Sequence, residues 1–380
     1  MSNAVAEQPH QFNCDLLIGE NDRIRARKLF PLIAQVLIDD SLAERFGAID
    51  ARANNRKRHG RRAGLTAVLL AVASLIGLSI SPLIKGAMPP IPTIVDLTAA
   101  LLGVISFLVA CLGVLRHSSK KRWLALRWCT ERMRQFHFQF LIAHAVEIVE
   151  ASKSQSSFDD LKKHYSAEMD KHFPLDDESF VREDVLENWK SALPLEPMAN
   201  VWLISDESAR PNAGDDALEQ FFQAYLDLRL DHQISYSAHV LGKKRGPLRL
   251  TLDRRQHWIE IIALACVGAL FLLHVAVVLG NLVGYPAWLV SMSHNPWTHV
   301  LTLWIAIVAL GTRVLEDGHG IRSDVVRYSD YLCNLRVLRS RYVTEPTIDG
   351  KLAIMRRVEE IAFVEMTSFL RSAAKSKYLL

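Results

Sequence analysis

Paired cysteines are missing from this sequence. Its 380 residues include five cysteines, and none of them belongs to a Cys-X-X-Cys motif. This pattern excludes a disulfide framework and a zinc site built on cysteine pairs, so we expect reduced, packed thiols. We expect neither a metal ion nor a cofactor.

Catalytic signatures are missing as well. The sequence has no glycine-rich phosphate loop, no HExxH and no GxSxG motif, each of which would bring specific reactive or phosphate-binding groups together. His232 and His239 are seven positions apart, with no third metal ligand beside them. We therefore expect that the protein is not an enzyme. One alternative stays open, namely lipid hydrolysis near the head groups by Asp231 with His232 or by Asp317 with His319.

A strong excess of one charge is also absent. The formal net charge is +4, and most of the basic excess lies beside apolar stretches. We therefore expect no direct binding to duplex nucleic acid. The first sixty residues are mostly polar, and the first apolar run is long enough to remain in a bilayer, so we expect no cleavable signal peptide.

Charged residues are absent from four long apolar stretches, which indicate a membrane protein. A hydrocarbon core about 30 Å thick needs about 20 apolar residues of helix to cross it. Residues 63–84 and 97–115 each fit one crossing, and the run 261–311 is long enough for two, with a break near Pro286 and Asn295-Pro296. The expected spans are 65–84, 97–115, 261–280 and 297–311.

Lysine and arginine cluster on one side of these spans only. The flanking basic residues are Arg52, Arg56, Lys57, Arg58, Arg61, Arg62, Arg116, Lys120, Lys121, Arg122, Lys243, Lys244, Arg245, Arg249, Arg254, Arg255 and Arg313. By the positive-inside rule, both termini and the middle of the chain lie in the cytoplasm, and the two connections 85–96 and 281–297 face out. We expect the lipid bilayer of the bacterial inner membrane as the environment.

The predicted fold is an all-α membrane protein with two transmembrane helical hairpins, four spans in all, and a helical cytoplasmic bundle. The predicted segments are a cytoplasmic N-terminal helical segment 1–62, a first transmembrane hairpin 63–116, a cytoplasmic helical region 117–260, a second transmembrane hairpin 261–312, and cytoplasmic C-terminal helices 313–380. Basic flank, hairpin and long exit helix occur twice in this order, as in an internal repeat.

Apolar residues at spacings of three and four predict long helices outside the membrane. These seams are Leu126, Cys129, Met133, Phe136 and Phe140, continued by Phe138, Ile142, Ala145 and Val149; then Ile321, Val325, Tyr328, Leu332 and Leu335; and, after a turn at 344–350, Leu352, Met355, Val358, Ala362, Met366 and Phe369. Whether they pack within one chain or between chains is open. We expect them to contribute to a homo-oligomer, because they extend further than a short hairpin can cover.

The region 151–217 is acidic and interrupted by proline. It predicts a capped helix at 174–189 and a loop at 205–216, and a helix resumes at 218 with Phe222, Leu226, Leu230 and Ile234 spaced by four. No motif in the region 151–217 assigns a role to it.

The basic juxtamembrane helix, the two-span hairpin and the exit helix RWLALRWCTERMRQFHF resemble the SLATT superfamily of bacterial effectors. The segment YLDLRLDHQISYSAHVLGKKRGPLRLTLDRRQHWIEIIAL resembles the helix that enters the second hairpin in tandem versions of such proteins. The resemblance implies a membrane-acting arm of anti-phage defence, with a partner nucleotidyltransferase making a nucleotide second messenger. It covers both hairpins and their flanks, about two-thirds of the chain.

The spans themselves predict a gated pore, because they contain no Asp, Glu, Lys or Arg as drawn. We expect Ser74, Ser79, Ser106 and Thr302 to bond to their own helix backbone, so a path between the spans would stay dewetted until widened. The expected gate residues are Ile105, Leu108, His274, Ile305 and Val308. His274 has the alternative of a structural hydrogen bond to a neighbouring helix. Small residues at Ala99 and Gly103, and at Ala265 and Ala269, predict close helix packing.

Four arginines beyond the membrane flanks are the expected ligand-binding residues: Arg127, Arg132, Arg134 and Arg336. Guanidinium groups suit the phosphates of a nucleotide. The alternative is contact with lipid head groups or with carboxylates such as Glu131. The function expected from the sequence is therefore an oligomeric, ligand-gated pore that depolarises the cell. The other candidate is a non-conducting membrane scaffold or sensor that recruits a cytoplasmic partner.

Overall fold

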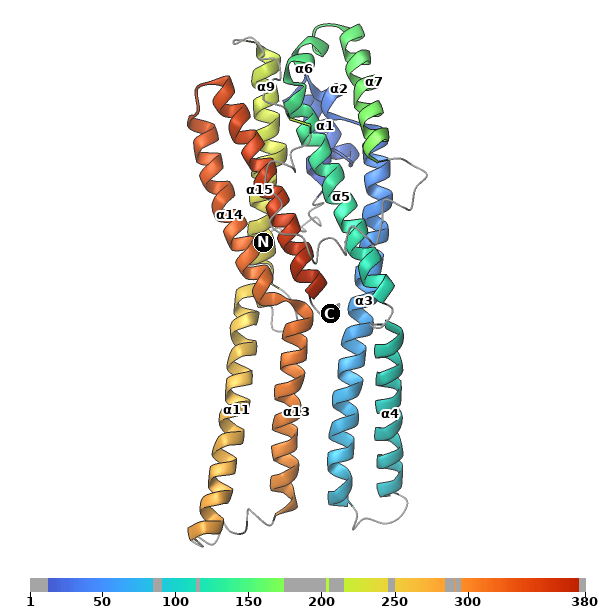
Figure 1. Ribbon diagram of the computed structural model, residues 1–380, viewed down its shortest axis with the longest axis vertical. Coiled ribbons are helices and arrows are strands. Elements are labelled where there is room, and N and C mark those ends of the chain that lie inside the picture. Colours follow the sequence, from blue (N-terminus) through green and yellow to red (C-terminus); the bar gives the residue numbers. More distant parts are fainter. Residues whose placement is uncertain are drawn as a thin grey trace, which may run out of the picture. The chain divides into compact units, whose positions relative to one another are not determined.

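The computed structural model describes residues 13–84, 91–113, 117–173, 203–204, 215–244, 250–283, 291 and 295–375. Helices are the only regular elements in these residues, and no β-strand forms among them (Figure 1). Four of the helices are long and apolar enough to cross a membrane: Ala34–Ile84, Ile91–Cys111, Leu252–Leu279 and Pro296–Val314. The predictions of an all-α fold and of four candidate membrane helices are confirmed.

The chain divides into two compact units. The core unit comprises Met1–Asn54, Arg122–Gly242 and Val326–Arg371, and the span unit comprises Asn55–Lys121, Lys243–Val325 and Ser372–Leu380. Helices α3 (Asp40–Ile80), α5 (His117–Ala143), α14 (Ile321–Thr344) and α15 (Ile348–Lys375) each contribute residues to both units.

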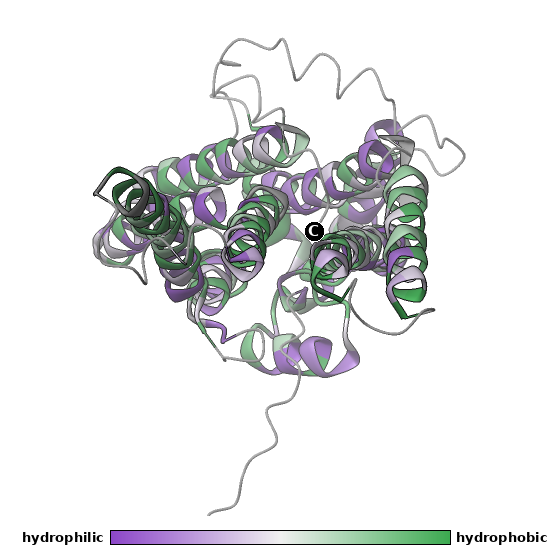
Figure 2. Cartoon of the chain, turned by 90° about the horizontal axis from the view of Figure 1, so that it is seen from below, coloured by the Kyte–Doolittle hydropathy of each residue, from purple (hydrophilic) through white to green (hydrophobic). Residues whose placement is uncertain are grey.

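The core unit is built from short and long helices around one apolar centre. Besides its parts of α3, α5, α14 and α15, its elements are η1 (Cys14–Leu16), α1 (Glu20–Leu29), α2 (Ala34–Leu37), α6 (Ala145–Ala151), α7 (Gln155–His172), α9 (Asp216–Tyr225), η5 (Leu226–Asp231) and α10 (His232–Gly242). Hydrophilic and hydrophobic residues, mapped in Figure 2, occur along the same helices. Many of the buried hydrophobic residues belong to one cluster.

The seam predicted on α5 lies in the centre of this cluster. Cys129, Met133, Phe136 and Phe140 are all buried, and the ring of Phe140 packs 4.9 Å from that of Tyr165, measured between centroids. The stripe predicted to continue to residue 149 does so on a second helix, because α5 ends at Ala143 and α6 begins at Ala145. The helical apolar pattern is therefore preserved across a break that the spacing did not show.

The seams of α14 and α15 are also buried inside a single chain. Leu332 and Leu335 are 8% and 0% exposed, and Met355, Val358, Ala362 and Met366 are buried. These seams therefore give no reason to expect a second copy, because residues of the same chain already cover them. The turn predicted between the two helices is confirmed, since α14 ends at Thr344 and α15 begins at Ile348.

The helix predicted from residue 218 begins slightly earlier. Asp215 caps α9 by accepting a hydrogen bond from the backbone N–H of Ala217 at 2.9 Å, as short polar side chains do at helix N-termini. The π-helical segment η5 and then α10 follow without interruption. The predicted helix 174–189 and most of the predicted loop 205–216 lie outside the described residues.

The span unit contains the second half of α3 with η2 (Ser81–Ile84), and α4 (Ile91–Gly113), α11 (Leu252–Val283) and α13 (Pro296–His319). All four helices extend beyond the predicted spans, and α3 begins at Asp40. Helix α4 begins six residues before 97 and therefore carries Asp96, α11 begins at Leu252, and α13 continues past 311. Proline is tolerated in a first helical turn, where its missing N–H has no partner anyway, so Pro92 does not prevent the early start of α4.

Serine hydroxyls join neighbouring helices within the span unit. Ser74 on α3 donates to the backbone oxygen of Ala99 at 2.7 Å, and Ser106 on α4 donates to that of Ala67 at 2.8 Å. Ser79 donates to Ile76 of its own helix, and Trp304 Nε1 donates to Ser79 Oγ. The expectation that Ser74 and Ser106 bond to their own helix is therefore wrong, because close packing brings a second backbone within reach.

Small residues explain the close packing of α3 with α4, but not that of α11 with α13. Ala99 is 2% exposed, and a Cβ built on Gly103 would lie 2.9 Å from Ser74 Oγ. Helices α11 and α13 pack along each other, yet Ala265 and Ala269 are exposed. Close packing is confirmed at Ala99 and Gly103, whereas Ala265 and Ala269 do not pack against another described helix of the same chain.

Candidate functional site

Two of the predicted ligand-binding arginines hold a buried carboxylate. On α5, Arg127 Nη2 lies 2.6 Å and Arg134 Nη1 lies 2.8 Å from Glu131. Burial alone would raise the pKa of the Glu131 carboxyl, but the positive charges of Arg127 and Arg134 lower it to about 2. Arg134 is 5% exposed and also pairs with Asp15, with 2.7 Å between Nε and Oδ2. The carboxylate partner considered for these arginines is therefore present in the structure.

Arg132 stacks against aromatic rings instead. Its guanidinium carbon lies 5.1 Å from the ring centroid of Trp128 and 5.2 Å from that of Phe363, within the range of a cation–π contact. Burial lowers the pKa of Arg132 to about 9, because a charged guanidinium is less favourable away from water.

Arg336 lies in a different place, on the exposed surface of α14. It lines an open groove of about 630 Å³ together with Leu241, Leu332, Arg341 and neighbouring residues of α14. None of the three α5 arginines lines this groove. The structure therefore brings Arg127 and Arg134 together at Glu131 and does not join Arg336 to them.

The predicted gate residues lie on outward faces of the span unit. Ile105, Leu108 and Val308 are 38%, 50% and 44% exposed, His274 is exposed and Ile305 is half-buried. Other described residues of the same chain leave a side chain on such a face uncovered. A path lined by these residues would therefore have to form between copies of the chain.

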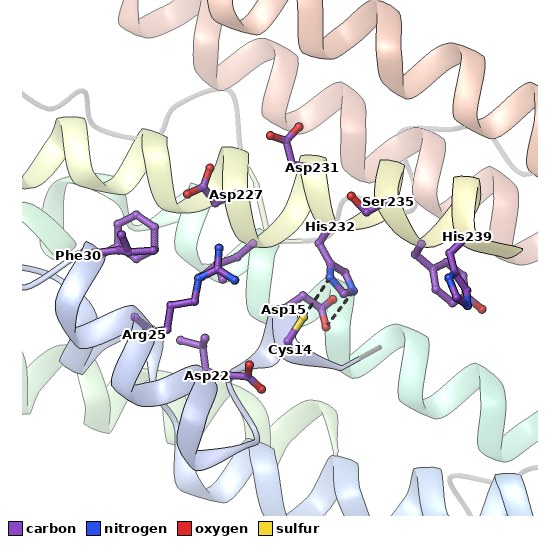
Figure 3. A pocket seen from close by; sticks show the side chains of 15 residues that line it. Cys14, Asp15, Asp22, Arg25, Phe30, Asp227, Asp231, His232, Ser235 and His239 are labelled. Carbon is purple, nitrogen blue, oxygen red and sulfur yellow. Dashed lines mark hydrogen bonds and ion pairs between the residues drawn. The ribbon is translucent and has the colours of Figure 1, made fainter. Parts of the chain in front are cut away.

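The core unit contains a cavity that the sequence did not predict. It has a volume of about 530 Å³, and its walls come from η1, α1, η5 and α10 (Figure 3). Cys14 and His232, which are 218 positions apart, meet there with 3.3 Å between Sγ and Nδ1. At the second ring nitrogen, Asp15 Oδ1 lies 3.8 Å from His232 Nε2. No local spacing could have indicated this contact.

The charged residues that line the cavity are mainly acidic. Asp15, Asp22, Asp227 and Asp231 contribute carboxylates, and Arg25 contributes a positive charge. Burial, followed by the negative charges of Asp15 and Asp22, raises the pKa of the Cys14 thiol to about 11. Burial also raises the pKa of Asp22. This environment is unfavourable for a phosphate group.

Metal binding finds no support in the described part of the chain, where no group of three or more histidine, cysteine, aspartate or glutamate side chains could hold an ion. His232 and His239 line the same cavity. Asp231, the predicted partner of His232 in lipid hydrolysis, forms an ion pair with Arg339, with 3.1 Å between Oδ2 and Nη2. The side chains of Asp317 and His319 lie outside the described residues.

Comparisons with protein-family models, with curated proteins and with solved structures found no match to this chain. The resemblance to the SLATT superfamily therefore stays a prediction from the sequence.

Proposed function

We propose that the chain is an inner-membrane effector whose copies assemble around a hydrophobic constriction and depolarise the cell. In this proposal the core unit lies in the cytoplasm and the four long apolar helices span the bilayer as two hairpins. The basic residues near the start of α11 and on α3 before its apolar half support that orientation, because lysine and arginine are retained on the cytoplasmic side.

The observation that carries the proposal is the continuity of α3. Residues of the buried core, Leu42 and Phe46, and residues of the helix packing, Ser74 and Gly77, belong to the single helix Asp40–Ile80. A rigid element shared by two units can transmit a change in one to the other. A signal bound by the core unit would thereby bias the packing of the membrane helices.

The exposed faces of the span unit support a hydrophobic gate. Leu101, Phe107 and Leu108 on α4 and Leu310 on α13 are large apolar side chains that are at least half exposed. Such faces can contact lipid in one state and line a dewetted path between copies in another. The trigger in this proposal is an anionic cytoplasmic ligand, for example a nucleotide, and Arg336 in the exposed groove supports such an interaction.

Polar substitution of the gate tests this function. Ile105→Asn, Leu108→Asn and Val308→Asn should each wet the constriction and depolarise cells without any trigger, as measured with a membrane-potential dye. Leu264→Asn is the matched control, because Leu264 is 73% exposed on α11 and is not one of the proposed gate residues. His274→Ala is tested separately for loss of function.

A scaffold that recruits a cytoplasmic partner is the second candidate. The groove beside Arg336 favours this function, because a partner protein could bind there. Leu241, Leu332 and Val337 contribute apolar surface to the groove, and Arg341 contributes a second positive charge. If the asparagine variants insert normally and none of them depolarises cells, the pore proposal is wrong and the scaffold is favoured.

A further inference from the structure

We propose that the cavity around Cys14 and His232 is a reaction site at which Cys14 Sγ accepts an acyl group from a thioester or an activated ester. This activity is independent of the membrane function proposed above. Neither the four long apolar helices nor Arg336 and Arg341 line the cavity.

The contact between the two side chains has the geometry of a nucleophile and its base. The 3.3 Å between Cys14 Sγ and His232 Nδ1 is within hydrogen-bonding reach for sulfur, so the thiol can pass its proton directly to the imidazole. Figure 3 shows the His232 ring facing both Cys14 and Asp15, each opposite one of its two nitrogens. At 3.8 Å from Nε2, the Asp15 carboxylate is too far for a hydrogen bond, but its negative charge stabilises a protonated imidazole.

The cavity also provides room for a substrate. Its volume of about 530 Å³ lies within the range of small-molecule sites. Cys14 is half-buried and lines the cavity. Phe30 and Tyr236 contribute apolar ring surface to the wall, and Ser235 contributes a hydroxyl group. An acyl chain could therefore lie against the aromatic rings with its carbonyl carbon near the sulfur.

The chemical step conserves atoms and charge. Cys14 Sγ forms a bond to the carbonyl carbon while its proton moves to His232 Nδ1, and the bond from carbon to the leaving oxygen or sulfur breaks. The leaving group takes the proton from the imidazolium, and the acyl group stays on Cys14 as a thioester. Water, deprotonated by the same imidazole, then hydrolyses the thioester and restores the thiol.

The thiol depends on this base, because its surroundings oppose ionisation. With its pKa raised to about 11, Cys14 has a thiolate population more than about 100-fold smaller than that of an ordinary thiol at the same pH. Without assistance it should react more slowly than the exposed Cys333. The order of the two reaction rates therefore shows whether a base assists Cys14: without a base Cys14 is slower than Cys333, and with one it is not.

The test uses 4-nitrophenyl acetate and the purified full-length protein in detergent. The acetylation of the peptides that carry Cys14 and Cys333 is followed by mass spectrometry at pH 7. We expect Cys14 to be acetylated at least as fast as Cys333, since general-base catalysis of about 100-fold or more offsets the roughly 100-fold smaller thiolate population of Cys14. Slower acetylation of Cys14 than of Cys333 would overturn the proposal, because thiolate population alone would then explain both rates.

Two variants and a pH profile assign the base. His232→Asn should reduce the rate at Cys14 below that at Cys333, and Cys14→Ser should remove the adduct. In the unaltered protein, the rate at Cys14 should level off as the pH rises, because an imidazole that is already neutral gains no further basicity. A rate that rises tenfold per pH unit up to pH 9, or that is unaffected by His232→Asn, would exclude the imidazole as the base.

Discussion

Arg229 and Glu359 form an ion pair that is almost completely removed from solvent. Their side chains are 2% and 0% exposed, and two bonds of 2.7 and 2.8 Å join the guanidinium to the carboxylate. Tyr225 donates a further bond of 3.1 Å to Glu359. Burial opposes the charge of Arg229, but the carboxylate more than offsets this effect and raises the pKa of the guanidinium.

Removing one partner of this pair should therefore lower the free energy of unfolding far more than removing one partner of an exposed pair. We expect Glu359→Ala to lower the free energy of unfolding of the core unit by about 3–5 kcal/mol, because it leaves a buried charge uncompensated. Arg357→Ala is the control, since Arg357 is 57% exposed beside Glu360, and it should cost less than about 1 kcal/mol. Denaturant unfolding of both variants measures the difference, and equal losses would contradict this explanation.

His137 should make stability depend on pH. Burial lowers its pKa to about 4, and Tyr165 Oη lies 3.0 Å from its Nδ1. An unfolded histidine has a pKa of about 6.5, so between these values the unfolded state binds a proton that the folded state does not. Stability is then lost as the pH falls from about 6.5 to about 4, by at most about 3 kcal/mol.

The corresponding variant isolates this effect. His137→Asn should flatten the pH dependence of the unfolding free energy in that window, whatever its effect on absolute stability. Glu131 acts at lower pH, because its pKa is held at about 2. An unchanged slope between pH 6.5 and 4 in the variant would show that other groups cause the dependence.

Helices α3 and α4 depend on a close approach at Gly77. A Cβ at this position would lie 2.9 Å from Ala99 Cβ, whereas one at Gly268 on α11 would meet nothing within 4 Å. We expect Gly77→Val to destabilise the span unit by about 1–3 kcal/mol, since the helices would have to separate. Gly268→Ala should be neutral or stabilise α11 by up to about 1 kcal/mol.

Thermal unfolding in detergent compares the two glycine variants. The separation of α3 from α4 should also weaken the bonds from Ser74 to Ala99 and from Ser106 to Ala67. If Gly77→Val unfolds at the same temperature as the parent, the contact at Ala99 does not stabilise this helix pair.

The whole molecule should have both termini and the core unit on the cytoplasmic side. In a cysteine-free background, a membrane-impermeant thiol reagent added to intact cells should label Pro89→Cys and Ser293→Cys. It should miss Ser156→Cys and Ser376→Cys until the membrane is permeabilised, because the basic flanks retain that side in the cytoplasm. Labelling of Ser156→Cys in intact cells would contradict the proposed topology.

The sequence alone determined the helices, the four candidate spans and most of the apolar seams. These features depend on local properties, namely the period of apolar residues and the length of uncharged runs. Phe136 and Leu335 could be assigned to buried helix faces for this reason, and both are 0% exposed. The ends of the spans were less certain, because a helix continues into polar residues such as Asp96 when nothing there interrupts its hydrogen bonding.

Tertiary structure decided which groups meet. Ser74 bonds to Ala99 on another helix, Arg134 pairs with Asp15, and Cys14 contacts His232 across 218 positions. A hydroxyl, guanidinium or thiol has several possible partners, and its choice depends on distances set by the packing of helices that are remote in the chain. The sequence therefore specified the apolar faces, whereas the roles of the polar side chains were determined only when those faces packed together.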